Sequence, residues 1–128
     1  MKKIVTEKAP GAIGPYSQAM VVGNVVYCSG QIPINPATGN VEATTIEGQT
    51  EQSCLNVKGL LEGAGTSIDK VFKTTCFIAD MADFAAFNAV YAKYFTSCPA
   101  RSCVAVKTLP KNVLVEIEAT AELSLIHI

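Results

Sequence analysis

The stretch "VLVEIEATAEL" (113–123) alternates apolar and polar residues, which is the pattern of a β-strand with one buried face. Apolar side chains at every second position would point into the protein core: Val113, Val115, Ile117, Ala119 and Ala121. The intervening positions would point to the other side: Leu114, Glu116, Glu118, Thr120 and Glu122. This strand therefore predicts a sheet with a core face and a second face that carries acidic residues.

A second strand is expected directly before it, at about residues 101–107, because apolar residues also alternate in "CPARSCVAV" (98–106). The connection "TLPKN" (108–112) is short enough for a hairpin, with residue 105 opposite 116 and residue 101 opposite 120. This register would place four side chains on the sheet face away from the helices: Arg101, Cys103, Glu116 and Glu118.

Two interpretations of that second face stay open. It is either a solvated surface, on which exposed charges contribute little to stability, or a subunit interface that encloses a small cleft. Cys103 and Ala105 are unusual on a solvated face and favour the interface. In a cleft, the planar guanidinium of Arg101 would be suited to binding a carboxylate through two parallel hydrogen bonds.

The N-terminal half shows the turn and cap signals of a hairpin followed by a helix. "VVGNVVYCSG" (21–30) predicts two short strands that meet at Gly23-Asn24, and the proline-rich "QIPINPATGN" (31–40) predicts a loop. Thr44 and Glu47 have capping-box spacing, and apolar residues then recur at helical spacing as far as Ala64. Gly63 and Gly65 would close this helix.

The next segment, "KVFKTTCFIAD" (70–80), is rich in strand-forming residues, and Asp80 is placed to cap a second helix. One face of that helix would carry an aromatic core stripe: Phe84, Phe87, Tyr91 and Tyr94. The expected order is three strands, a helix, a strand, a helix and two strands. That order predicts an α+β fold, a mixed sheet with both helices on one face.

Length and composition limit the class of protein. The chain has 128 residues, so we expect one domain over 1–128. A hydrophobic fraction of 49% with 16% charged residues would leave apolar surface on a single copy, so oligomerisation is expected. The net charge of −1 argues against binding to nucleic acid or to an anionic membrane. Without an apolar run of roughly 20 residues or a signal-peptide pattern in "MKKIVTEKAPGAIG" (1–14), we expect a cytoplasmic protein without membrane contact.

The cysteines indicate free thiols. There are five of them and no CxxC pair, so a reducing compartment is expected and a Cys98–Cys103 disulfide is disfavoured. The single histidine, His127, is close to the C-terminus, and no cluster of cysteine and histidine has metal-ligand spacing. We therefore expect no metal, and no histidine is available to activate Cys103 as a nucleophile.

Five segments, in order and over nearly the whole chain, resemble the Rid family of YjgF-type reactive intermediate deaminases: "GAIGPYSQAM" (11–20), "YCSGQIPINPATG" (27–39), "QTEQSCLNVKGLLEGAG" (49–65), "KTTCFIADMADFAAFNAVYAKYF" (73–95) and "PARSCVAVKTLPKNVLVEIEATA" (99–121). The resemblance implies a chorismate-mutase-like fold and a homotrimer with sites between subunits. It also implies hydrolysis of 2-imino acids, such as 2-iminobutanoate and 2-iminopropanoate, to 2-keto acids and ammonia without a cofactor.

The same resemblance implies roles for six residues. Arg101 matches the ligand of the substrate carboxylate and also marks the deaminase branch, and Glu116 matches the acid that orients or activates water. Tyr16 would reach into the cleft. Gly30 and Cys103 would contact the ligand through their backbone groups. Asn88 would line the cleft from the neighbouring subunit's side.

Two other function classes stay open. The first is a trimer that binds small carboxylates without turnover, and the second is an endoribonuclease or translation inhibitor, which the near-neutral charge disfavours.

The chain also departs from the family pattern in two places. The segment "FTSCPARS" (95–102) is short, with Cys98 where a phenylalanine is often found, and the apolar tail "ELSLIHI" (122–128) runs past the usual end.

Overall fold

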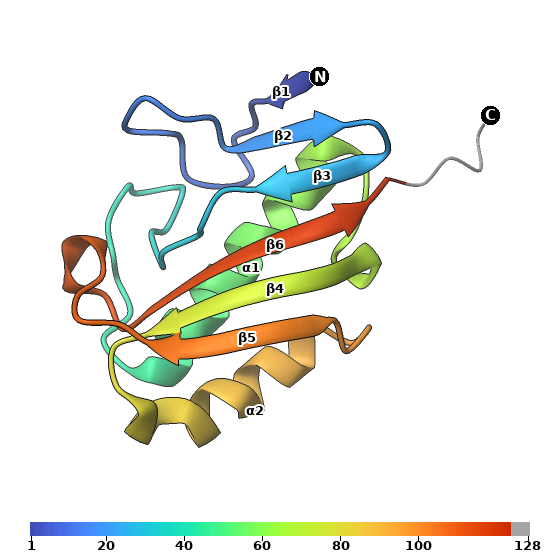
Figure 1. Ribbon diagram of the computed structural model, residues 1–128. Helices are drawn as coiled ribbons and strands as arrows, with labels where there is room; N and C mark the ends of the chain where they lie inside the picture. Colours follow the sequence, from blue (N-terminus) through green and yellow to red (C-terminus); the bar gives the residue numbers. More distant parts are fainter. Residues whose placement is uncertain (124–128) are drawn as a thin grey trace.

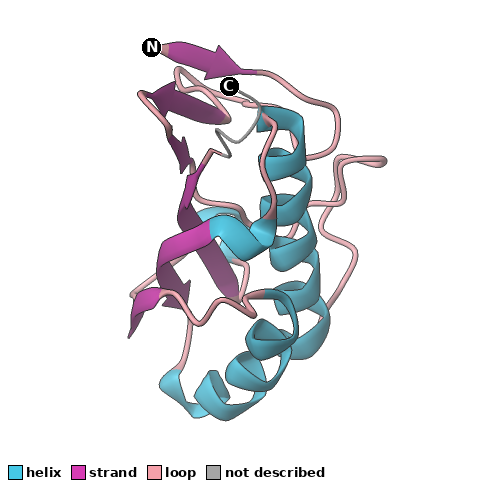
Figure 2. Ribbon diagram, turned by 90° about the vertical axis from the view of Figure 1, so that its right-hand side faces the viewer, coloured by secondary structure: helices cyan, strands magenta, loops and turns pink. Residues whose placement is uncertain are grey.

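The computed structural model describes residues 1–123, which form one six-stranded sheet with two α-helices on one face (Figures 1 and 2). In chain order the elements are β1 (Lys2–Ile4), β2 (Ala19–Val22), β3 (Val25–Cys28), α1 (Ile46–Ala64), β4 (Val71–Ile78), α2 (Phe84–Tyr94), β5 (Ala100–Ala105) and β6 (Val115–Glu122). The predicted α+β class and the predicted order of strands and helices are confirmed. The last five residues of the tail, 124–128, lie outside the described residues.

The strand β6 is at the centre of the sheet, whose order is β1-β2-β3-β6-β4-β5. It pairs antiparallel with β3 on one side and with β4 on the other. Its apolar residues are all buried on the side of α1, as predicted: Val115, Ile117, Ala119 and Ala121. The alternation of this strand therefore orients the whole sheet, with the helices on one face and the glutamates on the other.

The predicted hairpin between the last two strands is wrong. β4 lies between them, parallel to β5 and antiparallel to β6, and the chain from β5 returns through a single turn of 3-10 helix at Pro110–Asn112. β4 buries every second residue over most of its length, which fits a strand with neighbours on both sides. β5 has no fully buried residue, which fits the edge of a sheet.

This pairing also overturns the prediction that four side chains share the uncovered face. Residues directly opposite each other in neighbouring strands project from the same face. Thr74 lies opposite both Arg101 and Ala119, so Arg101 projects to the helix side, as Cys103 does two residues later. Glu116 lies opposite Phe77 and therefore projects, with Glu118, from the face that the helices leave uncovered.

The helix caps follow the sequence closely, with one shift. α1 begins after Thr45, whose Oγ1 accepts a hydrogen bond from the backbone N–H of Gly48 at 3.1 Å, so the predicted cap at Thr44 is wrong by one residue. The helix ends at Gly65, whose φ of 93° suits glycine. Asp80 accepts from the N–H of Ala82 at 2.9 Å and caps a 3-10 turn at Met81–Asp83 that leads into α2, whose own N-cap residue is Asp83, so the predicted cap lies one turn before the α-helix.

The N-terminal segment 5–18 packs on α1 at glycines. A Cβ on Gly59 would overlap the backbone carbonyl of Lys8, and a Cβ on Gly63 would overlap the side chain of Thr6. The buried amide of Gln18 ties the segment to itself, accepting from the N–H of Thr6 at 2.8 Å and donating to the carbonyl of Pro10 at 2.8 Å. This packing holds the loop that carries Tyr16.

Gly59→Ala should therefore lower the free energy of unfolding by about 1–3 kcal/mol, the usual cost of overpacking, although alanine is the better helix former. Denaturant unfolding measures this change. Lys58→Ala, at the exposed position just before it, is the control and should stay within about 0.5 kcal/mol of the wild type. A Gly59→Ala variant as stable as the wild type would show that the segment does not depend on this contact.

Candidate active site

Arg101 extends from the edge strand β5 toward α2. Its Nη1 donates a hydrogen bond to Oδ1 of Asn88 at 2.8 Å. Its guanidinium carbon lies near three ring centroids of α2, at 4.9 Å from Tyr91, 5.4 Å from Phe84 and 5.9 Å from Phe87. The partners within residues 1–123 are a neutral amide and aromatic faces, so the cation keeps donors for an anionic ligand.

The ring of Tyr91 is itself fixed in place. Its hydroxyl shares a buried 2.7 Å hydrogen bond with the hydroxyl of Thr74 on β4. Burial raises the pKa of Tyr91 to about 12, so the phenol stays neutral under ordinary conditions. Tyr91 therefore acts as a rigid neutral support under the guanidinium of Arg101 and is unsuited to serve as an acid or a base there.

Cys103 lies two residues beyond Arg101 on the same face, directly opposite the buried Cys76. Burial raises the pKa of the Cys103 thiol, and the charge of Arg101 only partly opposes this effect. The thiol is therefore protonated at neutral pH, which argues against a nucleophilic role. Because β5 is an edge strand, backbone groups along its free side remain available to a ligand. All five cysteines are free thiols, and Cys98 is exposed.

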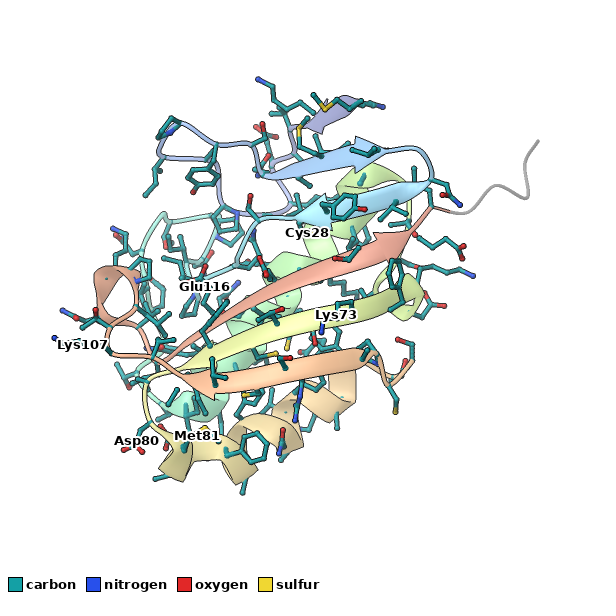
Figure 3. All side chains as sticks on the ribbon, viewed as in Figure 1. Cys28, Lys73, Asp80, Met81, Lys107 and Glu116 are labelled. Carbon is teal, nitrogen blue, oxygen red and sulfur yellow. The ribbon has the colours of Figure 1, made fainter. Side chains whose placement is uncertain are left out.

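A second group of residues is centred on Gly30, which lies against Glu116 on the uncovered face and lines a cavity with Tyr16. Figure 3 views this face, with Glu116 labelled near the start of β6. A Cβ on Gly30 would overlap the carboxylate of Glu116, so only glycine lets the two approach so closely. Paired backbone hydrogen bonds between Gln31 and Ile117, of 2.7 and 3.1 Å, hold the loop after β3 against β6 at this point.

Tyr16 joins this group from the N-terminal loop. It is 52% exposed, and it lines a small cavity of about 40 Å³ together with Gly30 and Gln31. The carboxyl of Glu116 is half-buried, and its pKa is raised first by burial and then by the charge of Glu118 on the same face. A carboxyl with a raised pKa is better suited to exchange protons near neutral pH.

The structure thus brings the six predicted residues together in two groups and not in one. We call Arg101, Asn88 and Cys103 the cation group, and Glu116, Gly30 and Tyr16 the acid group; the sheet separates them. Sequence reasoning missed that Phe84 and Tyr91 surround the guanidinium, because their helical spacing predicted core packing alone. An arginine facing an aromatic helix stripe is the signal that would have found them.

Within the described part of the chain, no three histidine, cysteine, aspartate or glutamate side chains are grouped closely enough to hold a metal ion. The same residues include no helix with the length and apolar character needed to cross a membrane.

Comparisons with known proteins match this chain over almost its full length. A family model described as Endoribonuclease L-PSP matches residues 6–123. The 2-iminobutanoate/2-iminopropanoate deaminase of Escherichia coli K12 is 51% identical over 124 residues, which cover 94% of this chain and 96% of that protein.

Solved structures agree with the described fold. The crystal structure of the YjgF gene product from Escherichia coli has a TM-score of 0.91 and 49% identity, and covers 95% of this chain and 98% of its own. Escherichia coli TdcF with bound serine has a TM-score of 0.92 and 46% identity, and covers 97% and 100% of the two chains. These likenesses confirm the predicted fold.

The raised pKa of Glu116 predicts a pH-dependent stability. Above its ordinary value of 4.5 the unfolded chain ionises this carboxyl while the folded chain resists ionisation, so the wild type loses stability as the pH rises. Glu116→Gln should therefore be more stable than the wild type at pH 7.5, with the difference vanishing at pH 4. Urea unfolding at both pH values measures this.

Glu122→Gln, at an exposed position on the same side of β6, is the control for the loss of one charge. It should differ little from the wild type at either pH. If Glu116→Gln behaved like this control, the half-buried position of the carboxyl would have no energetic consequence.

Proposed function

Because the chain belongs to the Endoribonuclease L-PSP family of YjgF/Rid proteins, we propose that it is a 2-imino acid deaminase. It would hydrolyse 2-iminobutanoate and 2-iminopropanoate to the 2-keto acids and ammonia. A relative at 51% identity carries the name of this activity. The observation that carries the proposal is the guanidinium of Arg101, which is held by Asn88 and left available for a carboxylate.

The active site is formed between copies of the chain. The cation group and the acid group project from opposite faces of one sheet, so one copy cannot hold a small substrate between them. The face that carries the acid group also exposes apolar side chains that a second copy would cover, namely Val22, Tyr27 and Val104, each 47–51% exposed. A homotrimer, in which each cation group meets the acid group of the next subunit, satisfies both demands.

Hydrolysis needs little chemical machinery. Arg101 binds the substrate carboxylate, and Asn88 restricts the guanidinium, which positions the imine carbon. Glu116 of the next subunit takes a proton from water as the water oxygen bonds to that carbon. The proton passes to the nitrogen, which gives a carbinolamine. The hydroxyl proton of this intermediate then passes to the nitrogen as the carbon–oxygen double bond forms, the carbon–nitrogen bond breaks, and ammonia leaves the keto acid. Tyr16 would hydrogen-bond the nitrogen, and the main chain at Gly30 and Cys103 would contact the ligand.

The proposal is tested by a coupled assay in which a dehydratase releases the imine from threonine or serine and semicarbazide competes for it. The wild type should restore keto-acid formation. Arg101→Ala should lower kcat/KM by roughly 10²–10⁴-fold, because two charge-assisted hydrogen bonds to the carboxylate are lost. If the wild type bound keto acids but did not hydrolyse imines, the proposed deaminase activity would be wrong and the chain would be a carboxylate-binding protein.

The location of the site between subunits predicts complementation. Arg101→Ala and Glu116→Gln should each be inactive alone, because every site then lacks one group. Random mixed trimers, formed by unfolding and refolding the two variants together, should regain about a quarter of the wild-type activity, since one site in four then receives both intact groups. Mixtures that stay as inactive as the separate variants would show that both groups act within one copy.

A further inference from the structure

A cavity of about 480 Å³ lies beside Arg101, between the C-terminal half of α2 and the segment that leads into β5. Tyr91, Ala92 and Phe95 line it from the helix side, and Thr96, Cys98 and Pro99 line it from the other side. Among the described residues that line it, Arg101 is the only charged one. The cavity therefore combines one cation with walls that are otherwise almost entirely apolar.

The position of the cation decides how an acid would lie in this cavity. Asn88 and the ring of Tyr91 hold the guanidinium at the cavity wall, so a carboxylate bound there is fixed at one end. The rest of the ligand then lies next to aromatic and small apolar side chains. Cavities of roughly 300–1,000 Å³ enclose ligands of drug size, so this one exceeds the need of a methyl or an ethyl group.

We propose that this cavity is the side-chain subsite of the deaminase, and that Ala92 and Cys98 determine the largest substrate side chain it admits. The inference rests on the proposed function and adds what limits the substrate, namely the space that these two small residues leave for an apolar side chain. Polar and charged side chains are disfavoured, because the walls offer them few partners beyond the hydroxyl of Thr96 and burying them unpaired is costly.

Ala92 and Cys98 are assigned this role because their side chains are small. Ala92 is an exposed position of α2, where a larger side chain is tolerated by the helix and would extend into the cavity. Cys98 is exposed and already has a φ of 51°, so replacing it with another side chain changes the space in the cavity more than the backbone strain.

The test compares kcat/KM for a small and a large imine. A dehydratase supplies 2-iminopropanoate from serine, and an amino-acid oxidase supplies the imines of leucine and phenylalanine, with semicarbazide as competitor throughout. Ala92→Phe should lower kcat/KM for the large imines by roughly tenfold or more and leave that for 2-iminopropanoate within about twofold. Cys98→Phe, which fills the cavity from the opposite wall, should do the same.

Ala85→Phe is the matched control, since Ala85 is exposed on α2 two turns before Ala92 and outside the cavity. It should leave both classes of substrate unaffected. If kcat/KM fell equally for small and large imines in both Ala92→Phe and Cys98→Phe, or fell in neither variant, the proposed subsite would be wrong. A wild type that is inactive toward every imine would overturn the proposed function itself, so the two failures are distinguishable.

Discussion

The position of β4 between β6 and β5 is the constraint on which the rest of the structure depends. A strand that is parallel to its predecessor needs a crossover, and α2 supplies it on the face already covered by α1. Arg101 projects from β5 to that same face, so its guanidinium meets the side chains of α2. The acids of β6 project the other way, so within residues 1–123 they do not neutralise the cation.

The surroundings of Arg101 follow from the cost of burying a charge. A guanidinium does not deprotonate, so a partly buried one needs partners that stabilise the cation. The structure supplies the amide of Asn88 and the face of Tyr91, which Thr74 holds from the neighbouring strand. These contacts limit the motion of the guanidinium without using up its charge, as recognition of a carboxylate requires. On the opposite face, Gly30 allows the close approach that partly buries the carboxyl of Glu116.

Much of the fold was predictable from the sequence because its signals are local. The alternation in β6 was interpreted correctly, and Asp80 is a capping residue, although it caps the 3-10 turn before α2 and not α2 itself. The cap of α1 was misplaced by one residue, since Thr44 and Thr45 are chemically equivalent and only the backbone geometry selects between them. The hairpin of the last two strands was wrong, because a short connection favours pairing only when no third strand competes for the same edge. The six site residues were named through the family resemblance, whereas the aromatic support of Arg101 was not found.

By itself, the sequence determined which segments form strands and helices, which face of β6 enters the core, and which residue types are available for chemistry. These are properties of neighbouring residues, and periodicity records them directly. Only the tertiary structure decided that Arg101 and Glu116 lie on opposite faces of one sheet. That outcome depends on the order in which distant strands pair, and each strand's own pattern is compatible with several orders. The choice among them is made by the packing of the whole chain.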